Sequence, residues 1–312
     1  VIIQDLAVMR LFRDHYPTIR RHASTQMAVH NMDGVRLMQE LGFDRVVLAR
    51  ELSLHEIAEI NRCVEIETEV FVHGAHCMSV SGMCYLSAML GGRSGNRGLC
   101  AQPCRLPYRV WEGDKAEGKS LNKENQKFVL SLKDLCTLDI LPEIIDAGVI
   151  SLKIEGRMKS EYYVASTVTA YRRALDGYYK TGIYSPSESL VAELEKTSHR
   201  RYTTGFYFGA LDTVCSDTSK PESDWLFIAE VKGYDESKKC IILEQRGRFK
   251  KGDVLEVLSP DENYLKKIVV DEVFDEDGNI IDDCKFVQQI LYLKSDVVLH
   301  NHDVLRMKRK DL

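Results

Sequence analysis

The sequence predicts an α/β fold in which a (β/α)-barrel-like domain of the TIM type is followed by a small antiparallel β-barrel. Three observations predict it. Short apolar strands alternate with amphipathic helices over residues 1–177, a cysteine-rich stretch interrupts the alternation, and short strands with turns take over from residue 225. Strand–helix alternation is typical of parallel sheets with right-handed crossovers. With 312 residues, the chain is long enough for one large and one small domain.

Six apolar segments are candidate strands of the first domain, and most of them precede a candidate helix. The strands are expected at 1–4, 21–27, 45–49, 66–74, 128–134 and 150–156, and the helices at 31–42, 53–63, 137–148 and 160–177. Ser53 and Glu56 form a capping-box pattern, and Gly177 marks the expected end of the last helix. Because eight strands close a TIM-type barrel, we expect an N-terminally truncated barrel with one or two units before Val1.

The domain boundaries follow from these changes of pattern. We expect a catalytic domain over 1–200 that carries a cysteine-rich insertion at 75–127, a connector over 201–221 and a β-barrel over 222–312. A further helix is expected at 185–196. The run DEDGN at 275–279 is a hairpin-turn signal within the β-barrel.

Composition and charge exclude several classes of protein. Hydrophobic residues make up 44% and charged residues 29%, which is ordinary for a globular protein, and no apolar run approaches the ~18 residues of a membrane helix. The net charge of −5 argues against a purely electrostatic nucleic-acid binder. Nine cysteines, an odd number, without a secretory signal favour a reducing, cytoplasmic location over a disulfide framework.

Polar residues follow several of the predicted strands. In barrels of this type the chemistry lies at the carboxyl ends of the strands. A simpler interpretation is that polarity returns wherever a strand ends. The polar groups are Ser24-Thr25-Gln26, Arg50-Glu51, His73, Lys133-Asp134 and Glu155-Gly156-Arg157.

The cysteine spacing points to a soft-metal site. Cys77 and Cys84 are separated by six residues, Cys100 and Cys104 by three, and Cys136 follows further on. Structural zinc prefers two tight cysteine pairs, and only the second pair is tight. Iron–sulfur clusters need four cysteines and tolerate irregular spacing. An iron–sulfur cluster, zinc and a metal-free loop all remain open on the residues alone.

Basic residues surround the same stretch. Guanidinium groups on a glycine-rich loop suit phosphate or carboxylate ligands, although a solvated loop face is the simpler interpretation. The sequence lacks the metalloprotease, serine-hydrolase, P-loop and dinucleotide-binding motifs. The basic residues in question are Arg93, Arg97, Arg105, Arg109, Lys153, Arg157 and Lys159.

Four long motifs resemble peptidase family U32: residues 69–87, 95–105, 131–136 and 151–164. The resemblance implies a barrel-like catalytic domain and two competing functions. One is a collagenase-like peptidase. The other is hydroxylation of an RNA base, at the wobble uridine of tRNA to give 5-hydroxyuridine or at a cytidine of 23S rRNA, by enzymes that carry a [4Fe–4S] cluster.

The resemblance also assigns roles residue by residue. It implies cluster ligands at Cys77, Cys84, Cys100 and Cys136, with Cys104 as the alternative fourth ligand. In the hydroxylase hypothesis, His73, Glu155 and Arg157 are candidates for proton transfer or anion binding. Arg93, Arg97 and Arg105 are candidates for RNA binding, and Tyr85, Tyr108, Tyr202 and Phe206 for base stacking.

The partner expected from this reading is tRNA, with rRNA or a peptide as alternatives. We also expect a homo-oligomer, or a hetero-oligomer with a second U32 protein. A third hypothesis is a non-catalytic scaffold in which zinc holds the cysteine loop.

Overall fold

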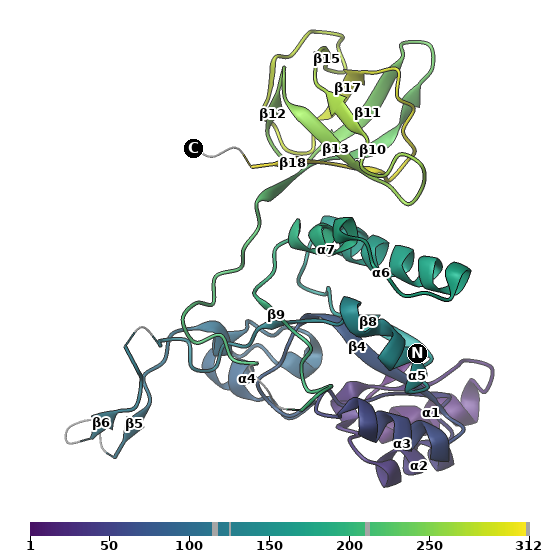
Figure 1. Ribbon diagram of the computed structural model, residues 1–312, viewed down its shortest axis with the longest axis vertical. Coiled ribbons are helices and arrows are strands. Elements are labelled where there is room, and N and C mark those ends of the chain that lie inside the picture. Colours follow the sequence, from purple (N-terminus) through teal and green to yellow (C-terminus); the bar gives the residue numbers. More distant parts are fainter. Residues whose placement is uncertain (114–117, 125, 210–212, 310–312) are drawn as a thin grey trace. The chain divides into compact units, whose positions relative to one another are not determined.

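The computed structural model describes residues 1–113, 118–124, 126–209 and 213–309, and the chain divides into two compact units (Figure 1). Unit 1 comprises Val1–Met158, Gly177–Pro186 and His199–Pro221. Unit 2 comprises Lys159–Asp176, Ser187–Ser198 and Glu222–Leu312. In the described part of the chain, no helix is both long and apolar enough to span a membrane.

Unit 1 is built on a parallel sheet. Its strands β1 (Ile2–Ile3), β2 (His22–Ala23), β3 (Arg45–Val47), β4 (Glu67–Ala75) and β8 (Ser151–Ile154) pair as parallel neighbours in that order. The predicted α/β class and the parallel pairing are therefore confirmed. The described strands form an open sheet, so the closure expected of a TIM-type barrel is not confirmed.

Helices connect these strands, and capping residues in the sequence predict the positions of most of them. α2 (Met32–Leu41) and α3 (Leu54–Cys63) lie where the sequence predicts them, and α3 begins with the predicted capping box between Ser53 and Glu56. α5 (Leu141–Asp146) follows a short 3₁₀ turn. α1 (Leu6–His15) is capped by the Asp5 carboxylate and lies in a segment where no helix was predicted.

One predicted strand is wrong. Residues 128–133 form a turn and a single bridge but no continuous strand, and the strand is instead β7 (Asp134–Cys136), which pairs antiparallel with β4 and parallel with β9 (Tyr202–Thr203). The apolar run is half-buried and pairs irregularly with residues 213–216: the Phe128 N–H donates to the Ser216 carbonyl, the Ser131 carbonyl accepts from the Cys215 N–H, and Leu132 forms a single bridge with Val214. A turn at residues 129–130 interrupts this pairing, which explains why a strand-like hydrophobic pattern does not give a continuous strand.

The second predicted strand is also too long. It ends at Ala23, and residues 25–27 form the 3₁₀ turn η1 (Thr25–Met27). The Ser24 hydroxyl accepts a hydrogen bond from the Gln26 N–H and so caps the turn at its start.

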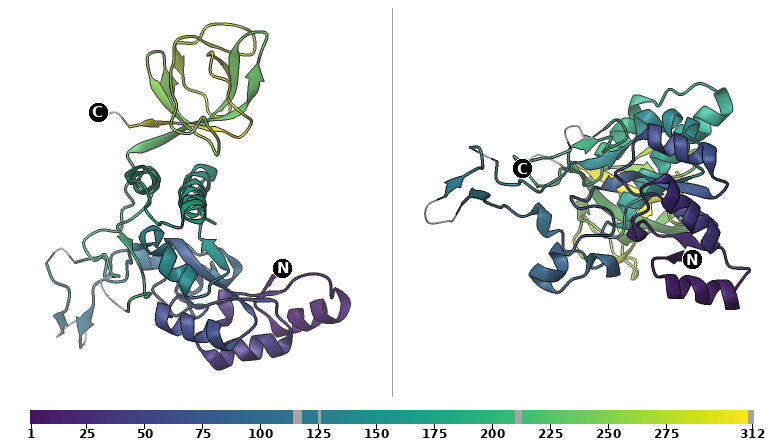
Figure 2. Two further views of the ribbon diagram at one scale, coloured as in Figure 1. Left: turned by 45° about the vertical axis from the view of Figure 1, so that its right-hand side comes forward. Right: turned by 90° about the horizontal axis from the view of Figure 1, so that it is seen from below.

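Short elements make up the cysteine-rich segment of unit 1. These are α4 (Leu86–Gly91), the 3₁₀ turns η2 (Gly95–Arg97) and η3 (Pro103–Arg105), and the paired strands β5 (Trp111–Glu112) and β6 (Lys119–Ser120). The β5–β6 pair projects from the rest of unit 1 in every view (Figure 2).

Unit 2 contains an antiparallel half-barrel, which confirms the antiparallel C-terminal sheet. Its seven strands pair in the order β14-β13-β18-β10-β11-β17-β15, and β12 pairs with β16 separately. Alternate strand residues fill one core, including Ile228, Ile241, Leu255 and Leu305. The strands are β10 (Trp225–Asp235), β11 (Cys240–Gln245), β12 (Phe249–Lys250), β13 (Val254–Leu258), β14 (Lys267–Val269), β15 (Val273–Phe274), β16 (Asp283–Cys284), β17 (Ile290–Lys294) and β18 (Val304–Lys308).

The predicted hairpin turn at 275–279 is confirmed. The Asp275 N–H donates to the Asn279 carbonyl, and Gly278 adopts the positive φ of 84° that such a turn requires.

Two helices belong to unit 2 for most of their length. α6 (Glu161–Thr181) runs through Gly177, so the predicted helix end at this glycine is wrong; the helix stops before Gly182, which has φ of 70°. α7 (Glu188–Glu195) lies within the predicted helix 185–196. Tyr162 of α6 packs in one buried cluster with Leu258 and Val304 of the half-barrel.

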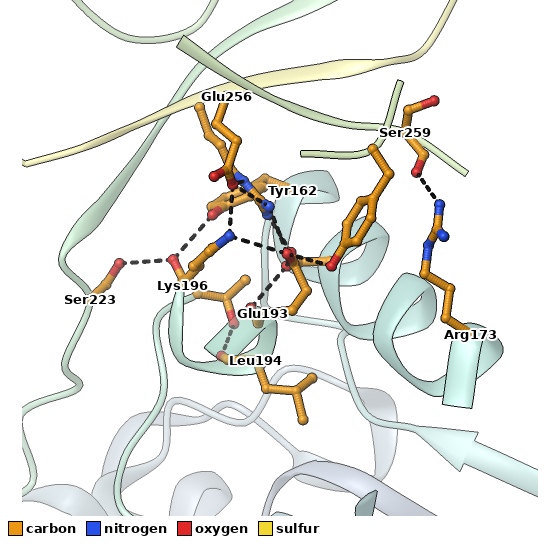
Figure 3. A network of polar contacts seen from close by, with 12 residues as sticks. Tyr162, Arg173, Glu193, Leu194, Lys196, Ser223, Glu256 and Ser259 are labelled. Carbon is orange, nitrogen blue, oxygen red and sulfur yellow. Dashed lines mark hydrogen bonds and ion pairs between the residues drawn. The ribbon is translucent and has the colours of Figure 1, made fainter. Parts of the chain in front are cut away.

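A buried ion network joins these helices to the half-barrel (Figure 3). The Arg306 side chain is fully buried and donates to both carboxylate oxygens of Glu193 on α7 and to Glu256 Oε1 on β13. Lys196 Nζ lies 2.7 Å from the same Glu256 oxygen. Burial alone would raise the pKa of Glu193, but the hydrogen bonds and charge of Arg306 outweigh it and hold that pKa below its usual value.

We predict that Arg306→Met destabilises unit 2 by about 3 kcal/mol, because it removes the buried cation that Glu193 and Glu256 share and leaves Lys196 as the cation nearest to both. The ring of Trp225 lies 5.6 Å from the Arg306 guanidinium, so its fluorescence in a Trp111→Phe background reports unfolding of this unit in urea. The control is Arg248→Met, which removes an exposed ion pair with Asp283 and should cost less than about 1 kcal/mol. Equal effects of the two variants would contradict the prediction.

Candidate functional site

The three residues predicted to be catalytic lie together at the carboxyl ends of β4 and β8. The Glu155 N–H donates to the His73 carbonyl at 2.8 Å, and the Glu155 carboxylate accepts from the Arg157 N–H at 2.9 Å. Gly74, with φ of 114°, permits this approach, since a Cβ there would lie 2.4 Å from the Glu155 carbonyl oxygen. The strand ends therefore bring a buried histidine close in space to a carboxylate and a guanidinium-bearing residue.

His73 also faces the strand that carries Cys136. The two residues are direct partners in the antiparallel pairing of β4 with β7. The His73 side chain is only 1% exposed, and its ring centroid lies 5.4 Å from that of Tyr202 on β9. The irregular sheet edge thus brings Cys136 to the same strand end as the predicted catalytic histidine.

Arg157 lies directly against the cysteine-rich segment. A Cβ at Gly98 would sit 1.8 Å from Arg157 Cζ, so the guanidinium rests on the glycine backbone. Gly98 also has φ of 72° and lies two residues before Cys100. This contact joins the end of β8 to the turn that bears one of the predicted cluster ligands.

Four cysteine thiols of this segment lie near one another. Burial raises the pKa of Cys77, and the neighbouring thiols of Cys84 and Cys100 raise it further. Burial likewise raises the pKa of Cys104, which is close enough to respond to the same three thiols. All four are free thiols. Their chemistry suits a soft metal or a cluster, but among the described residues no three cysteine, histidine or acidic side chains are placed as a metal-ligand set.

Arg105 is buried and holds the segment to the sheet. Its Nη1 donates to Ser131 Oγ and the Leu132 carbonyl, and its Nη2 donates to the His76 carbonyl at 3.0 Å. The Arg105 guanidinium therefore hydrogen-bonds within the protein. By contrast, the side chains of Arg93, Arg97 and Arg157 are exposed.

The same segment has a charge bias that the analysis of net charge misses. Residues 70–111 contain four arginines and no aspartate or glutamate, in a chain that has 47 acidic residues in all. A count of acidic residues in a moving window would have detected it. A stretch of chain without acidic residues and with exposed arginines favours a polyanionic ligand, although Glu51 and Glu155 from neighbouring strand ends contact it.

His76 is a site residue that the sequence did not single out. Burial, together with the charges of Arg50 and Arg105, lowers the pKa of His76 to about 4. The imidazole is therefore neutral at pH 7. The Arg50 guanidinium itself stacks 4.0 Å above the Phe71 ring, which holds this cation near the strand ends.

The aromatic residues considered for base stacking differ in their surroundings. Tyr85 is 66% exposed, whereas the Tyr108 hydroxyl donates to the Pro103 carbonyl. Tyr202 stacks on His199, and Phe206 meets His76 edge-on. Tyr85 is thus the most accessible of these four rings.

Comparison with known proteins decides the family. Residues 1–214 match the sequence model of Peptidase family U32, and residues 223–306 match that of the Peptidase family U32 C-terminal domain. The chain belongs to peptidase family U32. The resemblance noted in the cysteine motifs is therefore confirmed.

Several curated U32 relatives are similar to this chain. The tRNA hydroxylation protein P1 of Bacillus subtilis is 36% identical over 98% of this chain and 73% of its own length. The tRNA hydroxylation protein P of Escherichia coli is 31% identical over 84% of this chain and 67% of its own length. A 23S rRNA 5-hydroxycytidine synthase of Escherichia coli is 38% identical, but over 66% of this chain and 31% of its own length.

We predict that Arg105→Met destabilises unit 1 by roughly 3 kcal/mol, because the Leu132 and His76 carbonyls lose a buried charged donor. Hydrogen exchange of peptides covering residues 72–77 and 128–136 should rise in this variant. Arg97→Met, which changes an exposed guanidinium of the same segment, should leave both stability and exchange within about 0.5 kcal/mol of the parent. Unchanged protection in Arg105→Met would refute the structural role.

We also predict that Gly98→Ala displaces the Arg157 guanidinium. The variant carries a steric cost from Arg157 and a backbone cost of about 1 kcal/mol from the positive φ. In an Arg157→Ala background only the backbone cost should remain, giving a coupling of at least ~0.5 kcal/mol in a urea double-mutant cycle.

Gly92→Ala is the matched control for this cycle, since Gly92 has φ of 67° and open space around its missing Cβ. Its cost should not depend on Arg157. A coupling of zero for Gly98 would show that the two residues do not touch in solution.

Proposed function

We propose that this U32 chain is an RNA-base hydroxylase that forms 5-hydroxyuridine at the wobble position of tRNA. The observation that carries the proposal is the stretch 70–111, which contains the carboxyl end of β4 and the segment after it, bears four of the five cysteines between residues 77 and 136 and four arginines, and contains no aspartate or glutamate. The similarity to tRNA hydroxylation proteins over most of the chain supports tRNA over rRNA, because the rRNA relative matches a smaller part.

We further propose that a [4Fe–4S] cluster is held by Cys77, Cys84, Cys100 and Cys136, with Cys104 as the alternative ligand. The Cys84 and Cys100 thiols are near enough to raise the pKa of Cys77, and Cys136 lies opposite His73 in the pairing of β4 with β7. Such a cluster would supply redox or Lewis-acid chemistry. Zinc on the same thiols is the alternative.

The residues at the strand ends then have separate tasks. His73 and Glu155, linked through a backbone hydrogen bond, are proposed to move a proton at the reacting base. Arg157 would bind an anionic group of the substrate while Gly98 positions it. Arg93 and Arg97 would bind the phosphate backbone, since their side chains are exposed. Arg105 would position the segment and not touch RNA directly.

We also propose that the catalytic unit of the full protein is a TIM-type barrel. Within the described residues, the open sheet β1-β2-β3-β4 with β8 has the parallel, sequential pairing of a barrel segment. The relatives are longer than this chain. We also propose a cytoplasmic location, and oligomers with a second U32 protein, for the whole protein.

The test is complementation of a strain that lacks its own tRNA uridine hydroxylation. We expect the full chain to restore 5-hydroxyuridine, measured by mass spectrometry of tRNA nucleosides, and Cys77→Ser to abolish it. Protein purified without oxygen should contain about four irons and matching sulfide, with loss of iron in Cys77→Ser.

The double variant Arg93→Gln, Arg97→Gln should reduce the slope of log Kd for tRNA against log salt concentration by about one to two, which corresponds to the loss of one or two phosphate contacts. Arg248→Gln, far along the chain in unit 2, is its control. Unmodified tRNA with hydroxylated cytidine in 23S rRNA would favour the rRNA alternative. Gelatin cleavage that is lost in Cys77→Ser would favour the peptidase alternative.

A further inference from the structure

A set of buried polar atoms at the ends of β2, β3 and β4 has no hydrogen-bond partner within the described residues. It includes Thr25 Oγ1, Gln26 Oε1, Glu51 Oε2 and His76 Nδ1. Buried polar groups are normally paired, and leaving them unpaired costs free energy. In enzymes, such atoms at the carboxyl ends of parallel strands are candidates for binding substrate. None of these side chains has a task in the proposed catalysis.

Glu51 and Gln26 are held by consecutive residues of the cysteine-rich segment. Glu51 Oε1 accepts from the Ser81 N–H at 2.9 Å and from the Ser81 hydroxyl. The next residue, Gly82, lies against the Gln26 backbone, since a Cβ there would be 2.4 Å from the Gln26 carbonyl oxygen. Glu51 is therefore held by its side chain and Gln26 by its backbone, beside the residues that lie between Cys77 and Cys84 in the chain. Glu51 Oε2 and Gln26 Oε1 both lack a hydrogen-bond partner within the described residues.

The chemistry of the unused atoms defines the ligand. An ionised carboxylate only accepts hydrogen bonds, so Glu51 Oε2 requires an N–H or O–H donor. The unpaired Gln26 atom is the acceptor Oε1, and a turn of the amide about its last side-chain torsion exchanges it with the Nε2–H₂ donor. Arg50, next to Glu51 in the chain and stacked on Phe71, adds a cation that suits a carbonyl oxygen. An imide edge, with one N–H between two carbonyls, matches this set.

We propose that Glu51 and Gln26 bind the Watson–Crick edge of the uracil base, with Glu51 accepting from uracil N3–H and the Gln26 amide binding an adjacent carbonyl. The inference rests on the proposed function and names its specificity residues. Enzymes that modify a base in RNA read its exposed edge in this way. Cytosine has an acceptor at N3, so a carboxylate at that position disfavours it.

Glu51→Gln is the decisive variant. It keeps one carbonyl oxygen for the Ser81 N–H and replaces the other oxygen with a donor. Binding of an anticodon stem-loop is measured on the full chain purified without oxygen, with uridine or cytidine at the wobble position. We expect the uridine stem-loop to bind about tenfold more weakly to Glu51→Gln than to the parent, and the preference over cytidine to shrink by a similar factor.

Gln26→Met is the second variant, since it keeps the length of the side chain and removes its polar atoms. It should also weaken uridine binding, with unchanged iron content and thermal stability. Glu40→Gln, on the exposed face of α2, is the control and should change nothing.

The outcomes separate this inference from the function it rests on. If the parent hydroxylates tRNA and both variants bind and discriminate as the parent does, the unpaired atoms serve structure or bound water and the inference is overturned. Weaker binding of uridine and cytidine by the same factor would also overturn it, because that pattern reflects damage to the segment and not base recognition. If the parent neither binds nor hydroxylates tRNA, the proposed function itself fails.

Discussion

The buried guanidinium of Arg105 is the interaction on which the candidate site depends. It ties the cysteine-rich segment to the His76 carbonyl after β4 and to residues 131 and 132 before β7. Both ends of the segment therefore meet at one edge of the sheet. The predicted ligands Cys77, Cys100 and Cys136 flank these attachment points in the chain. A cation that pairs with several buried oxygens fixes geometry more firmly than apolar packing of a loop could.

Close approach of backbones is the second constraint at this edge. Gly74, Gly82 and Gly98 each meet a neighbour at a distance that a Cβ would prevent, and those neighbours are Glu155, Gln26 and Arg157. Gly82 and Gly98 thus allow the cysteine-rich segment to contact the residues that follow β2 and β8, and Gly74 allows β4 to approach the end of β8. Each of the three contacts involves a residue to which we assign proton transfer, anion binding or base recognition. The close backbone contacts at these glycines therefore also position the residues with proposed catalytic and binding roles.

Unit 2 is stabilised by a different device. Its half-barrel has an apolar core, but the contact with α6 and α7 is centred on Arg306, Glu193 and Glu256, with Tyr162 packed beside them. A buried network of this kind is costly to desolvate and therefore specifies one arrangement of helix and sheet more than it adds stability. The family match to the C-terminal domain begins at residue 223, so the two helices that complete this unit precede the matched region.

The sequence by itself determined the α/β class, the presence of a parallel sheet, the capped helix α3, the hairpin turn at 275–279 and the family, because periodicity, caps and long motifs are local signals. It misplaced β7 and the end of α6, since burial can hide a loop and a glycine can be tolerated in a packed helix. The sequence also showed polar residues after several strands, but it suggested no role for Gln26 or Glu51. Only the tertiary structure decided that Arg105 is buried, that Gly98 supports Arg157 and that Gln26 and Glu51 lie beside Ser81 and Gly82. These contacts join residues distant in the chain, and no local pattern encodes them.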